Sequence, residues 1–90
     1  MSQAANLMDG AVSDASDLSA RLALLTRWGY LTKKQSATLA QLVAAQLPCS
    51  LSVSKRSTHG SVYVRANCGQ DESLVFRLDP NARVYLSAGA

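Results

Sequence analysis

Hydrophobic and polar residues follow two different periods in the two halves of the chain. Between residues 14 and 48, apolar side chains recur at the spacing of one helix face, as Leu18, Leu22 and Leu25 do. Over residues 49–88, apolar and polar residues alternate instead, which is typical of half-buried strands. The pattern therefore predicts helices first and strands afterwards.

The N-terminal part of the chain predicts one helix behind an indistinct leading segment. Residues 1–13 show no clear period, and we expect them to form either a frayed segment or a short helix. The first distinct helix runs from about Asp17 to Trp28, with Ser16 as its N-cap. Gly29 supplies the left-handed residue that commonly follows the last turn.

A second helix is expected after a short connection. Thr32 and Gln35 match the capping box T-x-x-Q. In this motif the threonine hydroxyl accepts from an amide three residues on, and the glutamine reaches back to the threonine N–H. Pro48 ends the helix because proline cannot continue its hydrogen bonding. The short connection predicts an αα-hairpin.

Four strands are expected in the second half, joined by turns near residues 57–60, 68–71 and 79–82. In the last turn Asp79 is followed by Pro80, which suits a type I turn. Connections this short predict an antiparallel meander. A register with Val53 opposite Val64 would also place Cys49 opposite Cys68.

Together the halves predict an α+β fold in a single domain, residues 1–90. An N-terminal two-helix hairpin over residues 14–48 packs on one face of a C-terminal four-stranded antiparallel meander over residues 49–88, in the order ααββββ. Each layer has one apolar side, so the two sides must cover each other. The predicted core is Leu18, Leu22, Leu25, Trp28, Leu39, Leu42, Val43, Leu47, Leu51, Val53, Val62, Val64, Leu74, Phe76, Leu78, Val84 and Leu86.

Composition supports a small folded domain outside the membrane. The 90 residues are 48% hydrophobic and 17% charged, which argues against disorder of the whole chain. No apolar run reaches the roughly 18–20 residues that a membrane-spanning helix needs. The first residues also lack the basic start of a targeting segment. We therefore expect no membrane association and a cytoplasmic setting.

The sequence offers little for catalysis or for cofactor binding. Its one histidine, His59, falls at the tip of the first hairpin, where neither burial nor fixed neighbours would tune its pKa. There is no glycine-rich phosphate loop and no cluster of cysteine and histidine with metal-ligand spacing. Cys49 and Cys68 are expected to be unpaired thiols. We predict a protein that is not an enzyme, with no catalytic residue, cofactor or metal.

The predicted sheet face that the helices leave open carries an unusual set of residues. Tyrosine and arginine are enriched at the centres of protein interfaces, where they supply large contact areas and several hydrogen-bond donors. Cross-strand pairs of these residues also stabilise sheets by themselves, which is the alternative interpretation. The residues of this face predicted to bind a partner are Tyr63, Arg65, Arg77, Arg83 and Tyr85.

Two further segments are weaker candidates. The hairpin tip with Lys55, Arg56 and His59 could contact phosphate, although two basic residues fall short of a basic cluster. The helix pair could be a helix-turn-helix, with Lys33 and Lys34 opening its second helix. The second helix, however, has polar Gln35 and Thr38 where a packed recognition helix needs core residues, and a plain αα-hairpin also explains the connection.

The leading functional hypothesis is a small protein-binding module of the adaptor or inhibitor type. The Tyr/Arg face would dock onto a larger protein with an acidic or mixed surface, and the net charge of +3 would speed the encounter. The alternative is a nucleic-acid-binding domain that uses the same face and the basic hairpin tip. Tyrosines would then stack on bases and arginines would hold phosphates. The sequence leaves the oligomeric state open.

Overall fold

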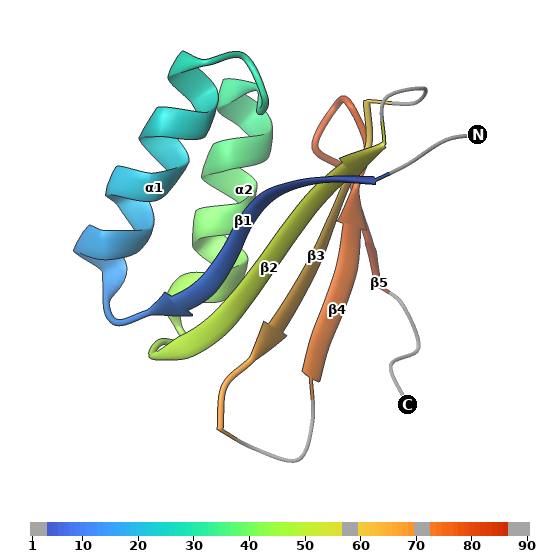
Figure 1. The fold of residues 1–90 in the computed structure, drawn as a ribbon. Coiled ribbons are helices and arrows are strands. Elements are labelled where there is room, and N and C mark those ends of the chain that lie inside the picture. Colours follow the sequence, from blue (N-terminus) through green and yellow to red (C-terminus); the bar gives the residue numbers. More distant parts are fainter. Residues whose placement is uncertain (1–3, 57–59, 70–72, 87–90) are drawn as a thin grey trace.

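The protein is a two-layer α+β structure in which two helices cover one face of an antiparallel sheet (Figure 1). The computed structural model describes residues 4–56, 60–69 and 73–86. The sheet has the strand order β1-β2-β3-β4-β5, so each strand pairs with its neighbours in the sequence. The elements are β1 (Ala4–Val12), α1 (Ala15–Arg27), α2 (Lys33–Ala44), β2 (Cys49–Arg56), β3 (Val62–Asn67), β4 (Ser73–Leu78) and β5 (Val84–Leu86).

The chain begins with a strand, so the predicted order ααββββ is wrong at its start. β1 is neither frayed nor helical: it pairs antiparallel with β2, with Met8 opposite Val53 and Val12 opposite Cys49. The register shifts between Asn6 and Met8, which breaks the alternation that would have marked a strand. Burial of Met8 and Val12 against the core fixes this strand in place.

Both helices start at residues whose side chains satisfy first-turn amides. In α1 the N-cap is Asp14 rather than the predicted Ser16, and an Asp14 carboxylate oxygen accepts from the Asp17 N–H at 2.9 Å. The capping box of α2 is confirmed: Thr32 Oγ1 accepts from the Gln35 N–H at 3.0 Å, and Gln35 Oε1 accepts from the Thr32 N–H at 3.1 Å.

The predicted meander is confirmed from β2 to β5. Val53 pairs with Val64, as the sequence predicts. In the turn before β5 the Ala82 N–H donates to the Asp79 carbonyl oxygen at 2.8 Å, which closes the turn between these residues. The four C-terminal strands therefore stand in the register that the turns favour.

The core lies between the helices and the central strands, and most of the predicted core residues are buried there. The prediction that Trp28 belongs to the core is wrong, because Trp28 lies beyond the last turn of α1 and is 67% exposed. Val84 and Leu86 are also exposed, although their pairing with Leu78 and Phe76 puts them on the helix side of the sheet. Figure 1 shows both helices on the side of β1 and β2, away from β5. Three predicted core residues are only partly buried: Leu42, Leu47 and Leu74.

None of the helices in the described parts of the chain is long and apolar enough to cross a membrane.

Candidate binding surface on the open sheet face

The face of the sheet opposite the helices carries two rows of side chains that run across the strands. In the first row Ser54, Tyr63, Arg77 and Tyr85 are successive cross-strand partners on β2 to β5. This alignment places three of the predicted site residues side by side on a regular scaffold. Because every second residue of a strand points to the same face, the rows follow from the register alone.

The second row has Ser52 opposite Arg65 and Arg65 opposite Val75. Arg65 is exposed and Val75 is half-buried. A shallow depression of about 410 Å³ lies over the two rows. Its lining joins hydroxyl groups, an aromatic ring, a guanidinium and an aliphatic side chain in one patch: Ser52, Ser54, Tyr63, Arg65 and Val75.

At the β5 end of the first row the side chains contact one another. The guanidinium carbon of Arg77 lies 4.1 Å from the centre of the Tyr85 ring, a cation–π contact across the strands. The Tyr85 hydroxyl lies 3.4 Å from Asp79 Oδ2, to which it donates. These contacts hold two large side chains in fixed positions, so a partner that binds them loses less side-chain freedom.

Arg83 lies directly before β5, in the turn that Asp79 organises. The Asp79 N–H donates to the Arg83 carbonyl oxygen at 3.1 Å, and Asp79 Oδ1 accepts from the Arg83 and Asn81 N–H groups, each at 2.9 Å. The hydrogen bond that the Arg83 N–H donates to Asp79 contributes most to holding the pKa of Asp79 below its usual value. Arg83 is exposed and lies two residues before Tyr85 in the sequence. Four of the predicted partner-binding residues therefore lie on β3, β4 and β5, and Arg83 lies in the turn before β5.

Of the hairpin tip, the structure describes the side chain of Lys55 but not those of Arg56 and His59. Lys55 Nζ donates to the Tyr30 carbonyl oxygen at 2.9 Å, so this charge lies against the connection between the helices. His59 and the Arg56 side chain lie outside the described residues.

Strand β1 extends the open face in a way that the sequence analysis missed. Asn6 is paired with Ser54 and Asp9 with Ser52, so both belong to the rows described above. Both residues are exposed. They were missed because residues 1–13 were not recognised as a strand. Asp9 adds a carboxylate to an otherwise basic face.

The two cysteines lie at the neighbouring ends of β2 and β3. Ser50 pairs with Asn67, so Cys49 and Cys68 follow one step further in the same register. Both are free thiols, as predicted. Burial, with Cys68 as a neighbour, raises the pKa of the Cys49 thiol to about 11. Cys49 is therefore protonated near neutral pH and is a poor nucleophile.

Within the described parts of the chain, no three histidine, cysteine or acidic side chains lie close enough together to hold a metal ion. The open face offers guanidinium donors, aromatic rings and hydroxyl groups.

Comparison of the chain with protein-family models, with curated proteins and with solved structures found no significant match.

Proposed function

We propose that the protein is a non-catalytic binding module, of the adaptor or inhibitor type, that docks onto a larger protein through its open sheet face. The observation that carries this proposal is the row Tyr63, Arg77 and Tyr85, aligned on three paired strands and held in part by the Arg77–Tyr85 contact. Tyrosine and arginine dominate the energetics of protein interfaces, above all when they are fixed before binding.

The charge of the face suits a partner with an acidic or mixed surface. The two rows and the turn before β5 carry three arginines, Arg65, Arg77 and Arg83. The same region carries two carboxylates, those of Asp9 and Asp79. Each guanidinium offers paired N–H groups that match the two oxygens of a carboxylate. Opposite charges across an interface raise the rate of encounter and select the partner.

The Arg77–Tyr85 contact favours a protein partner over nucleic acid. Base recognition on a sheet needs aromatic rings whose faces are open for stacking. The Arg77 guanidinium covers one face of the Tyr85 ring at 4.1 Å. Tyr85 is therefore better suited to edge and hydroxyl contacts with a protein surface than to intercalating between bases.

The test is affinity capture from the native cell followed by binding measurements with the purified partner. We expect Arg77→Ala and Tyr85→Ala each to weaken binding about tenfold or more, which corresponds to about 1–2 kcal/mol. Ser19→Ala, on the exposed surface of α1, is the matched control and should leave the affinity unchanged.

Two results would contradict the proposal. Full binding by a folded Tyr63/Arg77/Tyr85 triple-alanine variant would remove the open face from the interface. Binding to nucleic acid in an electrophoretic shift assay, falling steeply with salt and sensitive to Arg56→Ala, would support the alternative function. A protein partner requires instead that Arg56→Ala weakens binding less than Arg77→Ala.

A further inference from the structure

The edge of the molecule formed by β1 and α1 carries a largely apolar groove with two charged side chains along it, Arg21 and Asp9. The groove has a volume of about 300 Å³ and lies between the strand and the helix. Leu24 lies in the last turn of α1 and is 48% exposed, and Trp28, the residue that caps this helix, is 67% exposed. The groove is lined by Leu7, Met8, Arg21, Leu24, Leu25 and Trp28, together with Asp9 at its rim.

β1 leaves the sheet open along this same edge. It is the first strand in the order of the sheet, so one of its sides has no neighbouring strand within the described chain. An edge strand presents unpaired backbone N–H and C=O groups, and natural proteins usually shield it with lysine, proline or shortening. β1 spans nine residues, AANLMDGAV, and contains a register shift after Asn6 but neither lysine nor proline. β5, at the other edge, is only three residues long.

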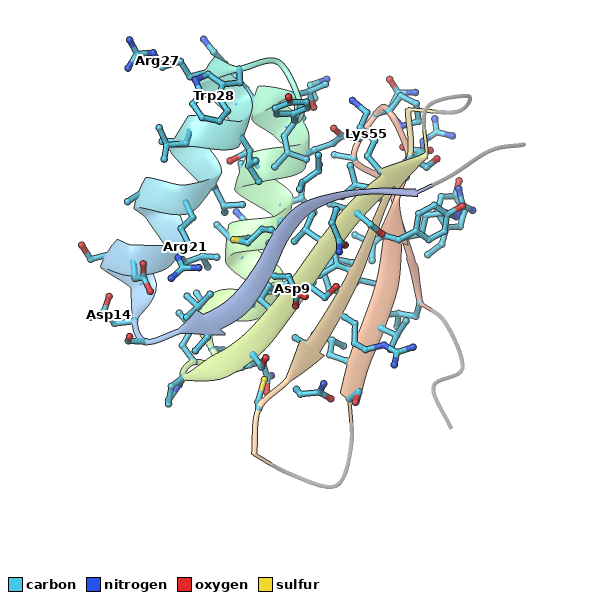
Figure 2. The ribbon with its side chains drawn as sticks, in the orientation of Figure 1. Asp9, Asp14, Arg21, Arg27, Trp28 and Lys55 are labelled. Atoms are coloured by element: carbon cyan, nitrogen blue, oxygen red, sulfur yellow. The ribbon has the colours of Figure 1, made fainter. Side chains whose placement is uncertain are left out.

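The charges along the edge change sign from one end to the other (Figure 2). Asp14 lies at the end where α1 begins, and Asp17 follows in the first turn. Arg27 and Trp28 lie at the opposite end, where Figure 2 also shows Lys55. The acidic end is only partly neutralised, because Arg21 is paired with Asp17 alone, at 3.0 Å.

We propose that this edge is an interface for a second copy of the chain, paired antiparallel about a two-fold axis. A two-fold axis places the same patch on both copies and reverses its direction. The acidic start of each α1 then faces the Arg27 end of the other, and the apolar stretch around Leu24 meets its own counterpart. This charge complementarity selects a second copy over an uncharged peptide as the occupant.

The interface uses α1 and the outer side of β1, and the residue that it shares with the rows of the open face is Asp9. The edge lies across the sheet from β5, where the Arg77–Tyr85 contact stands. A dimer built on this edge therefore leaves both open faces accessible. Failure of either proposal leaves the other in place.

The first test is the mass of the full chain in solution at rising protein concentration. We expect a monomer–dimer equilibrium in sedimentation velocity, shifted toward monomer by added salt because screening weakens the end-to-end attraction. Trp28 is the single tryptophan of the chain, so its fluorescence should shift to shorter wavelength as the dimer forms. A monomer throughout, with unchanged emission, would overturn the proposal.

Charge exchange tests the antiparallel arrangement. Arg27→Glu alone and Asp17→Lys alone should each remain monomeric, while an equimolar mixture of the two should form a heterodimer. Ser16→Lys adds one positive charge at an exposed position without removing the Asp17 contacts, and it keeps the test valid if Asp17→Lys unfolds. A mixture that stays monomeric, when the unaltered chain dimerises, would contradict the arrangement.

The two edges of the sheet are distinguished by a matched pair of substitutions. Leu24→Lys should abolish the dimer, whereas Leu86→Lys, at the exposed β5 edge, should leave it intact. The reverse result would place the contact at β5 and overturn the proposal.

Discussion

The side-chain amide nitrogen of Gln35 lies 2.9 Å from the carbonyl oxygen of Asp79 and donates a hydrogen bond to it. The same nitrogen donates to the Gly60 carbonyl oxygen at 3.1 Å, while the side-chain oxygen accepts from the Thr32 N–H. Gln35 is only 1% exposed. One buried side chain therefore joins the start of α2 to segments at the ends of two hairpins.

Replacing Gln35 by alanine should destabilise the protein more than replacing Thr32 by alanine. Loss of the Thr32 cap should cost about 0.5–2 kcal/mol. Loss of Gln35 removes a cap as well and takes a donor from the partly buried Gly60 and Asp79 carbonyl groups, and each hydrogen bond lost adds about 0.5–1.5 kcal/mol. Urea denaturation measures both values. Ser36→Ala is the control and should change stability much less; equal losses at all three positions would contradict the role of Gln35.

Phe76 and Leu86 are cross-strand partners on the helix side of the sheet with very different exposure, 1% and 71%. Phe76→Ala should cost about 3–5 kcal/mol, because it leaves a cavity in the core. Leu86→Ala should stay within about 0.5 kcal/mol of the unaltered protein, as exposed substitutions usually do. Thermal melting compares the two. Similar losses would mean that Leu86 is covered in solution.

The Arg77–Tyr85 contact should appear as a coupling free energy between the two residues. A double-mutant cycle with Arg77→Ala and Tyr85→Ala should give about 0.5–1 kcal/mol, the range of exposed cation–π pairs. Arg77→Lys keeps the charge but loses the planar stacking group, so it should recover only part of that coupling. A coupling of zero would show that the two side chains are not in contact in solution.

Cys49 should resist alkylation in the folded protein. Its pKa is raised to about 11, mainly by burial, so the reactive thiolate is scarce at neutral pH. The alkylation rate of Cys49 should rise about tenfold per pH unit between pH 7 and 9, as expected for a thiol that titrates above that range. Iodoacetamide labelling with peptide mapping measures the rate at each cysteine separately. A rate for Cys49 that levels off below pH 9 would contradict the raised pKa.

Asp79 should make the stability depend on pH in the acidic range. Its pKa is lowered in the folded state, chiefly by the Arg83 amide, so its ionised form stabilises the fold. This stabilisation is present above the unfolded pKa of about 4 and is lost as the pH falls through the folded value. The melting temperature of the unaltered protein should therefore exceed that of Asp79→Asn most at neutral pH, and the difference should shrink in acid. A difference that is constant with pH would contradict this.

The helices and the meander could be predicted because their signals are local. The capping box at Thr32 and Gln35 depends on residues three apart, and the Val53–Val64 register follows from one short hairpin. β1 could not be predicted in the same way. Its alternation is broken by the register shift after Asn6, and its partner β2 is separated from it by both helices.

The open face was predictable residue by residue, but its edges were not. Alternation alone places Tyr63, Arg77 and Tyr85 on one side of the sheet. Because β1 was not predicted, neither the position of Asp9 nor the groove beside Trp28 could be predicted. The helical spacing had assigned Trp28 to the core. Spacing shows which side of a helix a residue occupies; it does not show where the opposite layer ends.

The placement of β1 also has a consequence for synthesis on the ribosome. β1 leaves the exit tunnel before both helices, and its only hydrogen-bonding partner, β2, follows them. Until β2 emerges, the apolar side chains of Met8 and Val12 can be covered by nothing but the nascent helices. The pairing of β1 with β2 therefore has to wait until both helices have been synthesised.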